Sequence, residues 1–500
     1  MTEKGYMTDI YKQLQDVMNK CDNLSHELKT VKKETEKKYK LQIKKINEQH
    51  KKEITTLKVE IKTLKEDNQK LRNENDRLKK QLNNNSDNSS KPPSSDIKQN
   101  KKDIPNNREK SNKKVGGQVG HKGHCLSKKD VEDKINKKEY KHEVINVGEI
   151  SDNYISKYVI DVQVSVIAKE YRFYQDTNGK YNIPKEFQTD VQYGSEIKTL
   201  CSVLNTEGIV AIDRLTDFVS SISYGKLNIS NGSIVNFINQ LKNKCNPIIQ
   251  KIEEKILNSN IMYTDATTAR CNNRNICVRN YSTEKYTLLK ATIGKGKKYI
   301  LESNILPKYT GDLVHDHETV MYNYGKEHVE CNVHISRYLK GCYENTKNNW
   351  CKEMRNFLVC LNEYKKKIKG SGKKSIPKDK LERYSLRYDE ILKKGFEENK
   401  KVKSKFYKKE EKKILNRMKK YKRNHLLYIY NFDLPFDNNL SERELRHVKS
   451  KQKISGYFKS MTGIQGYLDI KSIIITCKKC SLDFYELIRN IFDNTPVTIM

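Results

Sequence analysis

The sequence has no hydrophobic run long enough to cross a membrane. A membrane-spanning helix needs about 20 mostly apolar residues, and no apolar run in these 500 residues approaches that length. The segment Met1 to Gly5 also lacks the basic-then-apolar layout of a secretory signal peptide. We therefore expect a protein that is neither embedded in a membrane nor secreted.

Hydrophobic side chains are also scarce, at 35% of the residues, compared with roughly 45–50% in ordinary globular chains. Part of the chain must therefore lie outside a packed core. With about 150 residues per domain, a length of 500 residues predicts about three domains. The 12 cysteines are scattered between Cys21 and Cys480, which favours reduced thiols in the cytoplasm over a disulfide framework.

Acidic residues are outnumbered by basic ones. The chain has 98 Lys and Arg against 63 Asp and Glu, a formal net charge of +35. AT-rich coding would explain some of the lysine without any selection for function. Even so, such a charge favours a polyanionic partner, and nucleic acid is the first candidate.

Proline is absent from residues 1–82, which we expect to form one long helical region. From Ile54 onward the apolar residues alternate at spacings of three and four, the heptad pattern of a coiled coil. Four leucines occupy successive d positions, and asparagine at two a positions favours a parallel dimer in register. The residues predicted to form this leucine-zipper dimer are Leu57, Leu64, Asn68, Leu71, Asn75 and Leu78. A charged helix exposed to solvent is the alternative.

Between this helix and residue 258 the sequence changes character three times. Residues 83–125 are rich in Asn, Ser, Pro, Gly and His, and we expect a flexible linker. Residues 126–192 include strand-like alternation, which favours a small β-rich domain. Residues 193–258 are helical in pattern, with two short amphipathic helices over 212–221 and 233–241. These two helices form either a helix-turn-helix or a pair of packed core helices.

Short strands and helices alternate from residue 259 to residue 340. Three strand-like runs are followed by a helix, a strand, a short helix and a fifth strand over 328–334. This is the order of a ribonuclease H-like α/β core, in which the first and fourth strands are neighbours. Asp265 lies on the first strand and Asp316 at the end of the fourth. Apolar strands rarely carry acids unless these are paired or bind a metal, although either Asp alone is more simply a strand-end or turn residue.

A third acid lies 126 positions after Asp316, near the start of a predicted helix. Residues 437–441 supply side chains suited to an N-cap, and Glu442 follows in the early turns. Arg443 and Arg446 fall on neighbouring helix faces. The simpler interpretation is a capped amphipathic helix with solvent-exposed charges.

Together these segments resemble the transposases of the insertion-sequence 66 family over nearly the whole chain. Besides the leucine zipper, the resemblance is carried by Asn88–Asp96 (NSSKPPSSD), Gly116–His124 (GGQVGHKGH), Asp316, the Cys-x-x-His-x-x-Arg segment Cys331–Arg337, and Asp437–Arg443 (DNNLSER).

The resemblance implies an Asp-Asp-Glu transposase whose triad is matched by Asp265, Asp316 and Glu442. In such an enzyme these acids hold two Mg²⁺ or Mn²⁺ ions for strand cleavage and strand transfer. The DNA partners would be the terminal repeats of an insertion sequence and a target DNA, and the resemblance suggests small accessory proteins as well. We expect a homodimer associated with the nucleoid in the cytoplasm.

The resemblance also accounts for the long separation of Asp316 and Glu442, because family members carry a helical insertion there. Residues 361–425 hold 25 Lys and Arg against 9 Asp and Glu, a local charge of +16, to which phosphates are attracted. A solvated helical face and lysine drift account for part of this charge. Basic residues predicted to meet phosphates beside the third acid are Arg443, Arg446, Lys449, Lys451 and Lys453.

The chain departs from the family in one respect. Family members usually have Cys-x-x-Cys pairs of a zinc-binding element after the Gly/His segment, whereas residues 126–200 contain no cysteine. The nearby Cys125, His121, His124 and His142 do not have zinc spacing, so zinc is not predicted. Cys331 and His334 match a family motif, but such a pair alone is more often a packed strand end than a pair of ligands.

The predicted fold is therefore an α/β ribonuclease H-like catalytic core with a helical insertion, preceded by a coiled coil and a small β-containing plus helical DNA-binding region. The parts are a coiled coil (1–82), a linker (83–125), a β-rich domain (126–192), a helical region (193–258), the first part of the core (259–340), the basic insertion (341–430) and the second part of the core (431–500). The alternatives to a transposase are an inactive coiled-coil DNA-binding remnant of one and a ribonuclease H-like resolvase of branched DNA.

Overall fold

The computed structural model of the chain describes residues 3–89, 126–148, 152–187 and 189–497. Most of the predicted linker, the Gly/His segment and Cys125 lie outside the described residues. The chain forms two compact units. One comprises Met1–Asn84 with Glu398–Lys413, and the other comprises Asn85–Glu397 with Ile414–Met500.

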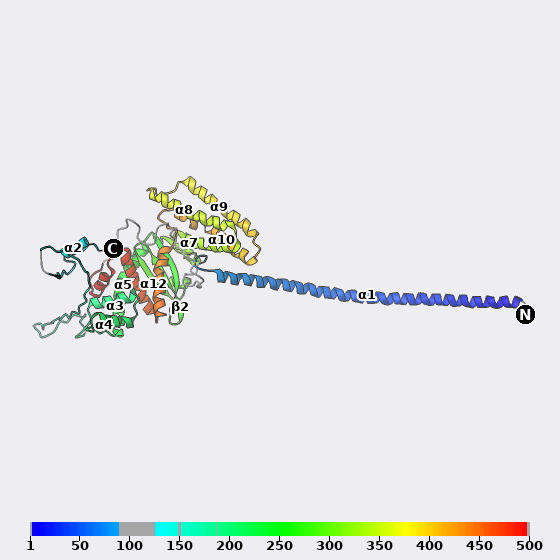
Figure 1. The fold of residues 1–500 in the computed structure, drawn as a ribbon, viewed down its shortest axis with the longest axis horizontal. Helices are drawn as coiled ribbons and strands as arrows, with labels where there is room; N and C mark the ends of the chain where they lie inside the picture. Colours follow the sequence, from blue (N-terminus) through cyan, green and yellow to red (C-terminus); the bar gives the residue numbers. More distant parts are fainter. Residues whose placement is uncertain (1–2, 90–125, 149–151, 188, 498–500) are drawn as a thin grey trace. The chain divides into compact units, whose positions relative to one another are not determined.

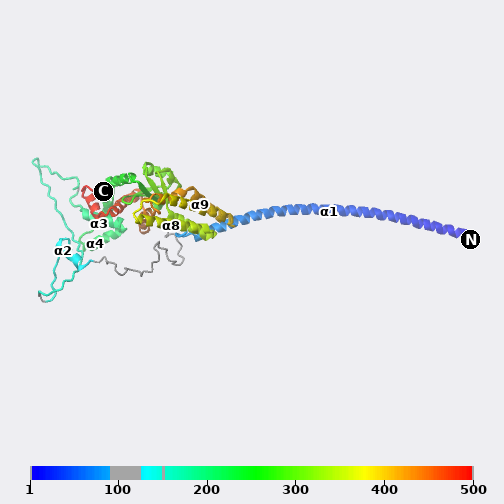
Figure 2. The ribbon, with the colours of Figure 1, turned by 90° about the horizontal axis from the view of Figure 1, so that it is seen from above.

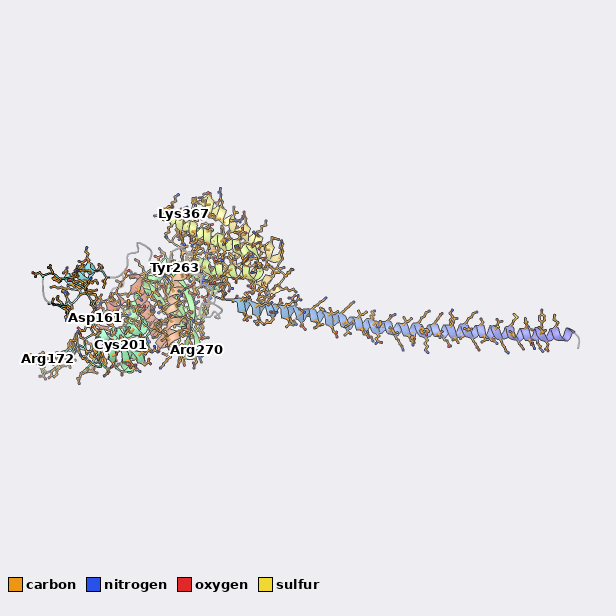
Figure 3. The ribbon with its side chains drawn as sticks, viewed as in Figure 1. Asp161, Arg172, Cys201, Tyr263, Arg270 and Lys367 are labelled. Carbon is orange, nitrogen blue, oxygen red and sulfur yellow. The ribbon has the colours of Figure 1, made fainter. Side chains whose placement is uncertain are left out.

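The first unit is dominated by α1 (Glu3–Asn83), a single helix of 81 residues (Figure 1). This confirms the predicted long helix. Its end contacts the other segment of the unit, where Lys80 Nζ lies 2.6 Å from Glu410 Oε2. The heptad leucines are uncovered in the single chain, with Leu71 71% exposed, and Figure 3 shows side chains around the helix along its length. Their burial requires another helix.

The second unit contains a mixed sheet of five strands. The strands are β1 (Ile261–Cys271), β2 (Arg274–Ser282), β3 (Thr287–Thr292), β4 (Asp312–His315) and β5 (His328–Glu330), in the order β3-β2-β1-β4-β5. β1, β2 and β3 pair antiparallel, whereas β4 pairs parallel with β1 and with β5. α6 (Lys297–Ser303) follows β3, and the 3-10 helix η3 (Thr319–Asn323) separates β4 from β5. The predicted order of strands and helices over 259–340 is confirmed.

Two strands in this region end earlier than expected. Asp316 was expected at the end of the fourth strand, but β4 ends at His315. The fifth strand was expected to reach His334, but β5 ends at Glu330 and α7 (Asn332–Thr346) begins two residues later. The backbone N–H of Asn332 donates to Phe436 O at 3.0 Å, and its side chain donates to His425 O at 3.0 Å. These contacts from distant segments start the helix in spite of the β-branched residues that follow.

Both faces of the sheet are covered by helices (Figure 2). On one face, α5 (Asn231–Leu257), α13 (Met461–Lys479) and α14 (Phe484–Phe492) bury a core with side chains of β1 to β4. On the other face, α12 (Asn439–Ser455) packs Leu445 and Val448 against β1 and β2. Members of the first core include Leu241, Ile252, Ile256, Met262, Leu288, Leu313, Ile470 and Ile474.

Helix α13 also protects the outer edge of β3. An edge strand presents unpaired N–H groups that invite association with other chains. Here Thr476 Oγ1, Ser472 Oγ and Gln465 Oε1 accept hydrogen bonds from the N–H groups of alternate β3 residues at 3.1, 2.9 and 2.9 Å. The helix therefore takes the place of a sixth strand at this edge.

The helical region before the sheet consists of α3 (Ser195–Thr206), α4 (Ile212–Ile222) and the start of α5. The two short helices expected over 212–221 and 233–241 are present in α4 and α5. They share a core that includes Cys201, Leu215, Val219, Ile234 and Phe237. This is the packed-helix arrangement, and a helix-turn-helix role for α4 and α5 stays a prediction.

The described part of residues 126–192 does not form the expected β-rich sheet. It contains α2 (Lys128–Asn136) and an isolated bridge between Gln175 and Tyr181, with no strand ladder among the described residues. Strands need partners for their N–H and C=O groups, and the apolar residues of this segment are exposed, with Val159 at 92%. Asp161 and Arg172, labelled in Figure 3, lie in this segment.

The segment between the fifth strand and α12 is helical, as predicted for the insertion. After α7 come α8 (Asn349–Gly370), α9 (Lys378–Lys400), α10 (Lys405–Lys420) and α11 (Lys422–Tyr430). Their core holds the single tryptophan, Trp350, which is completely buried together with Leu358, Tyr388 and Leu415. No helix in the described residues is long and apolar enough to span a membrane.

A buried carboxylate fixes α12 on the sheet. Glu444 is only 5% exposed and lies 2.5 Å from Lys479 Nζ. It also accepts hydrogen bonds from Thr287 Oγ1 at 3.0 Å and from the hydroxyl of Ser282. The helix is thereby tied to β2, β3 and α13 together.

Glu444→Ala should destabilise the second unit. The substitution leaves the largely buried Lys479 ammonium without its partner, and breaking such a pair costs about 3–5 kcal/mol. Urea unfolding followed by tryptophan fluorescence measures the effect. The matched control is Glu486→Ala on α14, whose side chain is 62% exposed and whose loss should cost less than about 0.5 kcal/mol. Equal midpoints for the two variants would contradict this account.

Candidate active site

The pairing of β1 with β4 brings two of the predicted catalytic acids together. In this parallel ladder Thr264 is opposite His315, so the next residues along the two strands, Asp265 within β1 and Asp316 just after β4, are neighbours. Burial and the adjacent Asp316 carboxylate raise the pKa of Asp265 to about 7. Like charges this close repel, so a positive group beside the pair is favoured.

The third predicted acid, Glu442, lies in the first turn of α12. The start of this helix is held by Asn438, which is completely buried. Its side-chain Nδ2 donates to Thr264 O at 3.0 Å, and its backbone N–H donates to Cys331 Sγ at 3.3 Å. The expected N-cap role of this segment is not fulfilled by Asn438, whose side chain makes no capping hydrogen bond. It connects α12 to β1 beside Asp265 instead.

His334 on α7 lies between the acids. Its Nδ1 atom is 3.0 Å from Asp316 Oδ1 and 3.8 Å from Glu442 Oε1. Burial opposes a charge on the ring, but the neighbouring Asp316 and Cys331 side chains prevail and raise the pKa of His334 to about 11. Sequence reasoning treated Cys331 and His334 as a packed strand end. The structure places His334 with Asp316 and Glu442, and the Cys-x-x-His spacing was the available signal.

The residues at this site fit a divalent cation. Asp316 Oδ1, His334 Nδ1 and Glu442 Oε1 are buried, and none makes a well-directed hydrogen bond. Buried polar atoms are otherwise nearly always satisfied. Ligand atoms of Asp316, Cys331 and His334 lie within 4.8 Å of one another. Carboxylate oxygens are the donors that Mg²⁺ and Mn²⁺ prefer, so the two carboxylates suit such an ion.

A second buried carboxylate supports the strand end that carries Asp316. Glu330 on β5 is completely buried. It accepts hydrogen bonds from His317 Nδ1 at 2.9 Å, Arg417 Nη2 at 2.6 Å and His425 Nε2 at 3.2 Å. Burial alone would raise the pKa of Glu330, but hydrogen bonds from the two histidines hold it well below the usual range. Arg417 and His425 belong to α10 and α11, so this network joins the end of the insertion to the residue after Asp316.

The basic residues predicted to meet DNA lie on α12 beyond Glu442. Arg443, Arg446, Lys449 and Lys453 are exposed, whereas Lys451 is partly buried. Lys451 Nζ donates to Asn205 O at 2.8 Å, and burial lowers its pKa to about 8. Lys449 Nζ contacts Thr268. Part of this basic set is therefore engaged within the fold, and its contact with DNA stays a prediction.

Two protein families match parts of the chain. Residues 191–466 match the family described as "Transposase IS66 family". Residues 40–127 match a family of unknown function, DUF6444. No curated protein sequence matches the chain. The first match covers more than half of the 500 residues and includes Asp265, Asp316, His334 and Glu442, which confirms the resemblance seen in the sequence: the chain belongs to the IS66 family of transposases.

Proposed function

We propose that this transposase binds the terminal repeats of an insertion sequence, cleaves DNA strands there and transfers them to a target DNA. Asp265, Asp316 and Glu442 are the proposed catalytic residues. The observation that carries the proposal is the approach of these acids, which come from three separate segments: Asp265 neighbours Asp316 across the β1–β4 ladder, and Asp316 and Glu442 both approach the buried His334 ring. Membership of a transposase family supports the same chemistry.

We further propose that the sheet is a ribonuclease H-like core. Its strand order, β3-β2-β1-β4-β5, and its three antiparallel strands followed by two parallel ones support this assignment. In such a core the first and fourth strands are neighbours that carry acids, and the pairing of β1 with β4 supports this comparison. The helical insertion between β5 and α12 then separates the second acid from the third only in sequence.

The proposed roles follow from the positions of the side chains. Asp265, Asp316 and Glu442 would hold one or two Mg²⁺ or Mn²⁺ ions. When bound, these ions activate the attacking oxygen and stabilise the leaving oxygen. Asn438 keeps the first turn of α12 against β1, and Glu330 keeps His317 and the end of β4 in place. The exposed Arg443 and Arg446 lie close enough in sequence to Glu442 to meet phosphates beside the site.

An inactive remnant is less well supported than an active enzyme. Loss of function would relax the constraint on buried acids, which are costly to retain in a fold. Here all three acids are present, and two of them approach His334. A resolvase would share the same site but would act on branched junctions in preference to terminal repeats, so the choice of DNA substrate separates it from a transposase.

Glu442→Gln should abolish cleavage while leaving binding of the terminal repeats intact. The amide keeps the shape of the side chain but loses the charge that holds a cation, and several kcal/mol of transition-state stabilisation correspond to at least about a 10³-fold loss of rate. Labelled repeat DNA with Mn²⁺ measures cleavage, and a mobility-shift titration measures binding.

The control for this experiment is Glu302→Gln. Glu302 is an exposed residue of α6, and this variant should cleave DNA like the wild type. Normal cleavage by Glu442→Gln would remove the third acid from the proposal. Loss of DNA binding together with cleavage would point to a structural role for Glu442.

We also propose that the chain forms a homodimer through a coiled coil in α1. The exposed heptad residues support this, because a row of leucines on a helix is stable in water only when another helix covers it. Small accessory proteins and association with the nucleoid are further expectations from the family.

Leu71→Asp should weaken or abolish the dimer, since it places a charge in the predicted seam. Analytical ultracentrifugation of the full chain at several concentrations measures the change. Asn73→Asp introduces the same charge at a heptad position outside the predicted seam and should leave the dimer unchanged. A monomeric wild-type chain, or equal dimerisation of both variants, would contradict the coiled-coil proposal.

A further inference from the structure

We propose that His334 is a direct ligand of the metal ion held by Asp316 and Glu442, so that the site contains a nitrogen donor as well as carboxylates. This inference deepens the proposed function and rests on it.

The distances around His334 fit a shared cation. Metal–ligand bonds of about 2.1 Å set at right angles separate two ligand atoms by about 3.0 Å. His334 Nδ1 and Asp316 Oδ1 are 3.0 Å apart. The separation of Nδ1 from Glu442 Oε1 is 3.8 Å, which corresponds to a wider angle at the same ion. Each of these two separations is compatible with an ion shared by His334 and the carboxylate concerned.

Burial and the lack of partners support the same position. His334 is 8% exposed, and its Nδ1 atom is buried without a well-directed hydrogen bond, as are Asp316 Oδ1 and Glu442 Oε1. An imidazole in the apolar core would normally be satisfied by the fold around it. This nitrogen instead faces two carboxylate oxygens, Asp316 Oδ1 at 3.0 Å and Glu442 Oε1 at 3.8 Å.

Cys331, the other side chain of the Cys-x-x-His pair, is less suited to be the ligand. Its sulfur already accepts the backbone N–H of Asn438 at 3.3 Å, and it begins the helix on which His334 lies. We infer that Cys331 fixes the start of α7 relative to α12. His334, one turn later, then faces the acids.

The hydrogen-bonding state of the other ring nitrogen, Nε2, distinguishes a metal ligand from a positioning residue. Nε2 lies 3.3 Å from Arg337 Nη1, a long distance for a hydrogen bond. Metal binding at Nδ1 places the proton on Nε2 and requires the guanidinium to turn aside. If Arg337 keeps Nε2 as an acceptor, the proton is on Nδ1, and His334 is a positioning residue that donates to the carboxylates.

The two possibilities differ in metal preference. Imidazole nitrogen favours later transition metals such as Co²⁺ over Mg²⁺, which prefers oxygen. A site made only of carboxylates lacks this bias. His334→Asp replaces the nitrogen with oxygen while keeping a ligand in place. It should lower the ratio of Co²⁺ to Mg²⁺ affinity by at least about tenfold.

The deciding experiment is pulsed electron paramagnetic resonance of Mn²⁺ bound to the full chain, because a directly bound imidazole gives a ¹⁴N coupling. We expect this coupling in the wild type and in His447→Gln, a control on the same helix as Glu442. We expect it to be lost in His334→Ala and in His334→Asp, with Mn²⁺ still bound to His334→Asp. Circular dichroism melting of each variant establishes that it is folded.

Ligation by His334 and the metal site itself can be refuted by different results. Mn²⁺ bound to the wild type without ¹⁴N coupling, or a coupling that survives in folded His334→Ala, would refute ligation by His334 and leave the proposed function standing. Equal Mn²⁺ affinity of the wild type and Asp316→Asn would instead refute the metal site on which the proposed function rests.

Discussion

The parallel pairing of β1 with β4 is the constraint on which the site depends. It places Asp265, midway along β1, beside Asp316, the residue after β4, where like charges repel and burial penalises the charged form of Asp265. Burial and the repulsion by Asp316 raise the pKa of Asp265 to about 7. An arrangement that is unfavourable for the protein alone becomes favourable when a cation is bound, and this is why we interpret the two acids as functional rather than structural.

Buried polar groups hold the other segments around this pair. Asn438 and Glu444 attach α12 to the sheet, so Glu442 in its first turn has a defined position. Glu330 joins β5 to α10 and α11, and thereby connects the end of the insertion to the strand that precedes Asp316. Each of these side chains forms hydrogen bonds with segments distant in sequence. The site is therefore as rigid as the packing of the sheet and its helices.

The sequence predicted those features that depend on local pattern. The length of α1, the order of strands and helices over 259–340 and the helical insertion follow from periodicity and from the placement of proline. The end of β5 was missed because tertiary contacts of Asn332 start α7 earlier than its β-branched neighbours suggest. The strand-like alternation in 126–192 misled because alternation indicates a strand only where a partner strand is available.

The candidate site could be predicted in part. Asp265, Asp316 and Glu442 came from strand position and family resemblance, but their approach depends on register, which one sequence does not contain. His334, Asn438 and Glu330 were not recognised as parts of the site because their roles rest on contacts between distant segments. The direct test of the account is anomalous diffraction from crystals of the protein grown with Mn²⁺. We predict a peak about 2.2 Å from carboxylate oxygens of Asp316 and Glu442; ordered Mn²⁺ elsewhere, with none at these acids, would contradict it.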